Sequence, residues 1–188
     1  MGADMTVEIE RLVLWFPIVF MLHDFEELLL FEPWLKKNAG SILERVHGRV
    51  PPWAEAQLHA VLHKSTLQFA FPIGLIFALT AAASFLAVQF HSYPLFLIAS
   101  SLFFLHGFLH IGQAAALRRY VPSLLTSVLL VLPYGGLLFT RLLAAGLVTL
   151  PTLLLYFLAA AVLAGPLLLG MHRLGEGLYG WAARRWAG

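Results

Sequence analysis

The chain has 188 residues, of which 60% are hydrophobic and 12% charged, with a formal net charge of +2 at pH 7 and a mean hydropathy of +0.83. A soluble domain carries about 25% charged residues, so this composition excludes an ordinary soluble protein and indicates an integral membrane protein. The chain contains no cysteine, which excludes disulfides, thiolate catalysis and cysteine-ligated metals.

The apolar segments predict an all-α integral membrane protein, a compact bundle of about five transmembrane helices in a single membrane domain over residues 1–188. Between Lys64 and Arg118 the chain contains no Asp, Glu, Lys or Arg. One span needs about 20 residues, so this run holds two spans. The turn-like sequence His91-Ser92-Tyr93-Pro94 separates them. The predicted spans are residues 10–32, 65–90, 94–117, 121–141 and 147–171.

The segment 33–64 is the one long polar stretch, and we expect it on the cytoplasmic side of the membrane. Within it, Ser41-Ile42-Leu43-Glu44 resembles a capping box and predicts the start of a short helix. Pro51-Pro52 predicts the start of another helix around Trp53. Trp53 and Lys64 are expected at the membrane interface.

The basic residues predict the orientation. If the N-terminus lies outside, only Arg11 and Arg141 lie outside with it, and the other ten basic side chains lie inside. This bias predicts an N-out/C-in topology. The basic residues then act as topology signals, and we expect no nucleic-acid partner. The ten are Lys36, Lys37, Arg45, Arg49, Lys64, Arg118, Arg119, Arg173, Arg184 and Arg185.

In the first predicted span, four polar side chains lie close together in the sequence: His23, Asp24, Glu26 and Glu27. An ionised carboxylate in the middle of a bilayer costs roughly 2.5–3.5 kcal/mol, so we expect metal, cation or proton chemistry to offset it. The spacing i, i+3 and i+4 places His23, Glu26 and Glu27 on one helix face. Asp24 points about 100° away from His23.

Two histidine pairs have the same i, i+4 spacing. His106 and His110 lie in the third predicted span, and Gln113 continues their face. His59 and His63 lie near the start of the second span. Two imidazoles one helical turn apart are the usual way for a helix to hold one metal ion.

Depth in the bilayer predicts that two of these clusters meet. Counted from the cytoplasmic interface at 1.5 Å per residue, Glu27 and His110 each lie roughly 10 Å deep. On the same count, His23 and His106 each lie roughly 16 Å deep. The residues expected to converge in the inner half of the bilayer are His23, Glu26, Glu27, His106 and His110, with His63 closing the site from below and Gln68 further in.

Small residues and prolines predict close helix contacts and irregular helices. Gly107 and Gly112 flank the His106 pair and are expected to let another helix approach closely. The run Pro133-Tyr134-Gly135-Gly136 makes the fourth span the expected place for an irregular helix.

The sequence from His23 to Glu27 has the pattern His-x-x-Glu-Glu, and Arg118-Arg119-Tyr120-Val121-Pro122 forms an Arg-x-Tyr-x-Pro-like block after the histidine pair. In both features the chain resembles the HXXEE domain family of small integral membrane proteins, which are mostly bacterial. The resemblance covers about residues 12 to 140. The chain departs from the family pattern at Ser123, where a Gly is common. The resemblance implies a bacterial inner (cytoplasmic) membrane location and a multi-pass protein, but it brings no activity with it.

The leading hypothesis is a membrane-embedded, metal-dependent enzyme that hydrolyses a lipid or lipid-like ester, amide or phosphoester from the cytoplasmic leaflet. The donor set suits a divalent metal, Zn²⁺ rather than Fe. Glu26 and Glu27 are the expected catalytic residues, since a carboxylate that is not a ligand can take a proton from water. The expected metal ligands are His23, Glu27, His106, His110 and His63. The side chains expected around them are Asp24, Gln68, Gln113 and Tyr120.

Other interpretations stay open. If His59 and His63 join the site, two histidine pairs with carboxylates suit a di-iron centre that oxidises a lipid. Intramembrane His and Glu residues also mark ion pathways, so the protein can be a metal-ion or proton transporter or sensor. The chain has no inverted repeat of the transporter kind. A metal-free proton site and an accessory subunit with a polar packing cluster complete the alternatives, and the oligomeric state is open.

Overall fold

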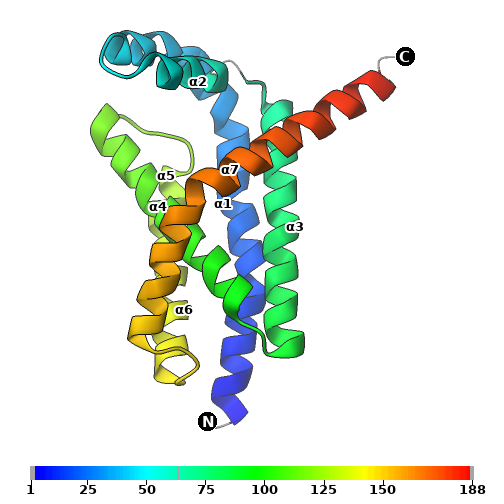
Figure 1. Ribbon diagram of the computed structural model, residues 1–188. Coiled ribbons are helices and arrows are strands. Elements are labelled where there is room, and N and C mark those ends of the chain that lie inside the picture. Colours follow the sequence, from blue (N-terminus) through cyan, green and yellow to red (C-terminus); the bar gives the residue numbers. More distant parts are fainter. Residues whose placement is uncertain (1–2, 63, 187–188) are drawn as a thin grey trace.

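The fold is built of helices. The computed structural model of the protein describes residues 3–62 and 64–186, and no strand occurs within these residues. The elements are α1 (Ala3–Val46), α2 (Pro52–Leu62), α3 (Thr66–Phe90), α4 (Pro94–Leu117), α5 (Leu124–Thr126), the π-helix η1 (Ser127–Val131), α6 (Leu132–Ala144) and α7 (Leu150–Trp186). α1 runs the length of the molecule beside α3, and α7 packs across α3 and α4 (Figure 1). α1 begins at one end of the bundle and α7 ends at the other.

Four helical runs among the described residues are long and apolar enough to cross a membrane: α3, α4, the run from α5 to α6, and α7. The chain is therefore an all-helical, multi-pass membrane protein, as its composition predicts. α1 does not belong to this group of four. Its apolar run is interrupted by Asp24, Glu26 and Glu27.

α1 is longer than predicted. The prediction that a new helix begins at Ser41 is wrong, because α1 continues without a break to Val46. The Ser41 hydroxyl donates to the carbonyl of Asn38, one turn earlier, and so does not cap a new helix. Leu35 and Ile42 are buried in a small apolar cluster with side chains of α2 and α3. This packing stabilises the C-terminal third of α1 as a continuous helix, whereas the helix predicted after Pro51 is confirmed as α2.

The predicted boundaries of the middle spans agree with α3 and α4 to within about one residue. Ser65 and Gln68 form a capping box at the start of α3, which ends at His91 in the left-handed conformation, with φ of 50°. Pro94 occupies the first turn of α4, where its missing N–H is not needed. The last two spans differ more. The fourth begins with α5 and a π-helical segment, and α7 continues to Trp186.

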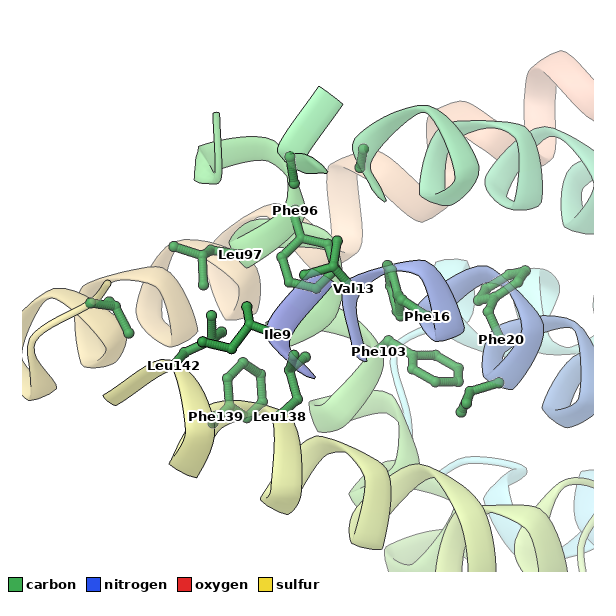
Figure 2. Close-up of a cluster of buried hydrophobic side chains, with 14 of the residues drawn as sticks. Ile9, Val13, Phe16, Phe20, Phe96, Leu97, Phe103, Leu138, Phe139 and Leu142 are labelled. Carbon is green, nitrogen blue, oxygen red and sulfur yellow. The ribbon is translucent and has the colours of Figure 1, made fainter. Parts of the chain in front are cut away.

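Phe16 is fully buried in the larger apolar core, where side chains of α1, α4 and α6 pack together (Figure 2). Its ring centroid is 5.5 Å from that of Phe96 and 5.7 Å from that of Phe103. Lipid is as apolar as these side chains, so in a bilayer close packing rather than removal from water holds such a core. Buried members of the core include Ile9, Val13, Phe16, Phe20, Phe96, Leu97, Phe103, Leu138, Phe139 and Leu142.

Gly175 and Gly107 are among the glycines that permit close helix contacts. A Cβ on Gly175 of α7 would lie 2.6 Å from the backbone N of Pro72 in α3. A Cβ on Gly107 of α4 would lie 3.0 Å from Cγ1 of Val131 in η1. Gly112 differs from the prediction, because a Cβ there would meet nothing within 4 Å. α7 therefore crosses α3 at a distance that only glycine allows.

We predict that Gly175→Ala destabilises the protein by about 1–3 kcal/mol, because the new methyl group overpacks the crossing of α3 and α7. The matched control is Gly170→Ala on the same helix, where a Cβ meets nothing within 4 Å. Thermal unfolding in detergent, followed by tryptophan fluorescence, measures both variants. Equal unfolding temperatures for the two variants would contradict the close crossing.

Candidate metal centre

Four side chains from two helices come together inside the bundle. His23 and Glu27 come from α1, and His106 and His110 come from α4. Each offers one ligand atom, and these four atoms all lie within 4.8 Å of one another. The structure thus brings together four of the five residues that were expected to converge. The fifth is Glu26.

The three imidazoles surround a common point. The ring centroid of His23 lies 5.5 Å from that of His106 and 5.1 Å from that of His110. Nε2 of His106 lies 2.9 Å from Nε2 of His110 and 4.0 Å from Oε2 of Glu27. Donor atoms of a tetrahedral zinc site lie about 3.4 Å apart when the bonds are about 2.1 Å long. Shifts of roughly 1 Å in side-chain positions would therefore close these four donors around one ion.

Hydrogen bonds determine which nitrogen of His23 is free. The hydroxyl of Thr126 donates to Oε2 of Glu26 at 2.6 Å, and Nδ1 of His23 lies 3.0 Å from the same hydroxyl oxygen. A hydroxyl has a single proton, so toward His23 it must accept, and Nδ1 carries the hydrogen. Nε2 of the neutral ring then has a lone pair. It is buried, with no hydrogen-bond partner among the described residues.

Glu26 does not belong to the four-residue group and is bound by Thr126 and Tyr120. Its Oε2 accepts from the backbone N–H and the hydroxyl of Thr126, at 2.8 and 2.6 Å, and its Oε1 accepts from the hydroxyl of Tyr120. The catalytic role expected for Glu26 stays a prediction, and both of its oxygens accept hydrogen bonds. Neighbouring residues on a helix point about 100° apart, so Glu27 faces the imidazoles while Glu26 faces α5.

An irregular helix supplies the partners of Glu26 and His23. Ser123 precedes α5 in the left-handed conformation, with φ of 65°, which is the conformation that glycine adopts most readily. Its hydroxyl donates to the backbone carbonyl of His23 at 3.2 Å. The π-helix η1 follows directly after Thr126. Wide turns of this kind occur frequently at functional sites. The irregularity predicted for this helix thus occurs, a few residues before Pro133.

The structure places some of the other predicted site residues near the cluster and one of them away from it. Asp24 and Gln113 line the same cavity as the cluster, and Tyr120 contacts Glu26. Gln68 does not lie at the site: its Oε1 accepts from the backbone N–H of Ser65 at 3.0 Å and so closes the first turn of α3. His63 lies outside the described residues.

His59 lies away from the cluster, in a small pocket between the end of α1 and α2. His47 shares this pocket, and its Nδ1 lies 2.7 Å from Oε1 of Glu55. This hydrogen bond raises the pKa of His47. The arrangement joins α2 to the end of α1 in the polar segment.

The family described as "Protein of unknown function with HXXEE motif" matches residues 14–138, well over half of the chain. The chain belongs to the HXXEE family. The resemblance of the sequence to this family is confirmed, and the matched region contains the whole four-residue cluster as well as Glu26 and Thr126. No curated protein and no solved structure matches the chain.

In this HXXEE protein the cluster forms part of the wall of a large cavity. The cavity has a volume of about 790 Å³ and lies between α1, α2, α3, α4 and α7. Glu27, His106 and His110 are on its wall, and the rest of the lining is mostly apolar. Representative apolar residues are Phe31, Ile73, Leu102, Leu109, Ala164 and Leu168.

Sequence reasoning missed the role of Thr126 and the extent of the cavity. Thr126 lies more than 100 residues from His23 in the chain, and only its position at the start of an apolar span set it apart. The cavity walls consist of Leu, Phe and Ala residues that resemble ordinary lipid-facing or packing residues. No local pattern separates the two cases.

Proposed function

We propose that the protein is a membrane-embedded, metal-dependent hydrolase that acts on a lipid or lipid-like substrate from the cytoplasmic leaflet. The observation that carries the proposal is Nε2 of His23, a buried lone pair without a hydrogen-bond partner among the described residues. A buried acceptor without a partner costs about 1–3 kcal/mol. A cation bound between His23, His106 and His110 would remove this cost.

The three histidines are the proposed ligands, and Zn²⁺ is the proposed metal. Catalytic zinc sites use three protein ligands and leave one position open for the reaction. The contact from Thr126 to Nδ1 of His23 supports this role, since metal-binding histidines are usually oriented through their other ring nitrogen. The separate location of His59 favours a single ion over a di-iron centre.

Glu27 is the proposed proton-transfer residue. It lines the cavity next to His106, whereas the oxygens of Glu26 are engaged by Thr126 and Tyr120. A divalent metal in this position supplies a Lewis acid that polarises the substrate carbonyl and lowers the pKa of water. Glu27 takes a proton from water as the water oxygen attacks the acyl carbon. It returns the proton to the leaving oxygen or nitrogen as the C–O or C–N bond breaks, so the products are a carboxylic acid and an alcohol or amine.

For the topology we propose five spans, with α1 as the first, in an N-out/C-in orientation in a bacterial inner membrane. The exposed face of α1 supports its place in the bilayer, because large apolar side chains recur there every three or four residues. The ten-to-two distribution of basic residues supports the orientation. The exposed apolar side chains on α1 are Leu14, Trp15, Ile18, Leu22, Phe25 and Leu29.

We predict near-stoichiometric Zn²⁺ in the protein purified in detergent, and loss of this metal in His106→Ala, because one of three ligands is removed. Elemental analysis by mass spectrometry measures the content. The matched control is His91→Ala in the loop before α4, which is expected to keep its metal. If the wild-type protein holds no metal even after reconstitution with Zn²⁺ and Fe²⁺, the proposed function is wrong.

We predict that Thr126→Val weakens Zn²⁺ binding by about 10–100-fold, because His23 loses the acceptor that orients its ring. Competition with a chromophoric chelator measures the affinity. Ser127→Ala is the neighbouring control, since the buried hydroxyl of Ser127 has no hydrogen-bond partner among the described residues. Equal affinities for the two variants would show that Thr126 does not act through His23.

We predict that Glu27→Gln keeps its metal but lowers the rate of hydrolysis by about 10²–10⁴-fold, the range expected when a general base is lost. Release of fatty acid from a panel of acyl esters and amides in mixed micelles, followed by mass spectrometry, measures the rate. Glu44→Gln, on α1 outside the cluster, serves as the control. Loss of metal from the Glu27 variant would instead assign Glu27 as a ligand.

A further inference from the structure

The cavity beside the cluster restricts what the proposed hydrolase accepts. Its volume is about 790 Å³. Pockets that bind a small molecule usually measure about 300–1,000 Å³, so this cavity has the size of a site for one ligand molecule. One long acyl chain with a small head group is a ligand of this size.

The polar part of the cavity wall favours an uncharged head group. Asp24, Glu27, His106, His110 and Gln113 supply the polar atoms nearest the cluster, and none of the described residues lining the cavity is Lys or Arg. Proteins that bind phosphate or carboxylate groups use Arg, Lys or free N–H groups at helix N-termini. Apart from the proposed metal ion, this wall offers no positive charge to an anionic head group.

Three basic side chains near the proposed cytoplasmic end of the bundle are engaged by other groups. Lys64 forms an ion pair with Glu176 at 2.6 Å, and Lys36 forms one with Glu32 at 2.7 Å. Arg119 donates to Oδ1 of Asn38 at 2.5 Å. None of these three basic residues lines the cavity.

Two helix N-termini in this region are also engaged, in both cases by carboxylates of α1. The backbone N–H of Thr66 at the start of α3 donates to Glu32 at 2.9 Å. The backbone N–H of Thr126 in α5 donates to Glu26 at 2.8 Å. The protein's own acids thus occupy positions at which a phosphate group is commonly bound.

We propose that the substrate is a neutral lipid with a single acyl chain, joined to its head group by an ester or amide bond, and not a phospholipid. This inference rests on the proposed hydrolase activity, which would cleave that ester or amide bond. The chain lies along the apolar wall formed by α3, α4 and α7, and the carbonyl group lies at the cluster. The ligand class itself is testable by binding alone.

The test uses photo-crosslinking probes that share one acyl chain carrying a diazirine. The probes are a monoacylglycerol, the lysophosphatidic acid with the same chain, and a diacylglycerol. We expect the monoacylglycerol to label the purified protein at least tenfold more than either of the others, on peptides of α4 and α7. Equal labelling by the lysophosphatidic acid, or stronger labelling by the diacylglycerol, would overturn the inference.

A pair of variants on α7 tests whether the probe occupies the cavity. Ala164→Trp places a large side chain on the cavity wall and is expected to abolish labelling by the monoacylglycerol. Val162→Trp, at a position that is 67% exposed and not on the cavity wall, is expected to label like the wild type. Undiminished labelling of the Ala164 variant would overturn the inference.

Metal content measured on the same samples separates this inference from the proposed function. Selective labelling of a protein that holds no metal would support the ligand class and contradict the hydrolase. Stoichiometric metal in a protein that labels without selectivity would overturn the ligand class and leave the hydrolase standing.

Discussion

The hydrogen bonds from Glu26 through Thr126 to His23 are the interaction on which the site depends. In the low-dielectric interior of a helix bundle, a carboxylate without donors would be strongly destabilising. Here Glu26 accepts three hydrogen bonds, from the backbone and side chain of Thr126 and from Tyr120. The same bonds hold the ring of His23 with its free nitrogen toward the histidine pair of α4. The polar residues of α1 are tolerated because another helical run presents donors at the same depth.

That run can do so because it is not a regular α-helix. Its chain enters through Ser123 in a left-handed conformation, which costs an ordinary residue roughly 1–2 kcal/mol. The hydrogen bond from Ser123 to the carbonyl of His23 offsets part of this cost. The π-helical turn follows, and its Val131 packs against Gly107 of α4. The departures from regular geometry therefore occur where α1, α4 and η1 must meet around the site. The core around Phe16 packs the bundle next to it, since Phe103 contacts both Phe16 and His23.

Much of the fold follows from the sequence, because the boundaries of α3 and α4 are marked by the charges of Lys64 and Arg118 and by a turn with a proline between them. Helical spacing and depth were sufficient to predict that His23, Glu27, His106 and His110 approach one another. Depth also placed Gln68 at the site, and a capping-box pattern placed a helix start at Ser41. Both assignments failed because local bonds and packing against α2 and α3 decided them. Glu26 and Glu27 looked equivalent, since adjacent acids on one helix differ only in which neighbour each one faces.

By itself the sequence determined the membrane class, the approximate helices, the family motif and the set of polar residues that the apolar interior must accommodate. These are properties of composition and of local spacing, which a chain carries wherever it folds. The tertiary structure alone decided that Glu27 faces the histidines, that Glu26 is bound by Thr126, and that a large apolar cavity opens beside them. Those outcomes depend on donors about 100 residues away in the chain and on which helix faces pack together. No local pattern encodes that packing.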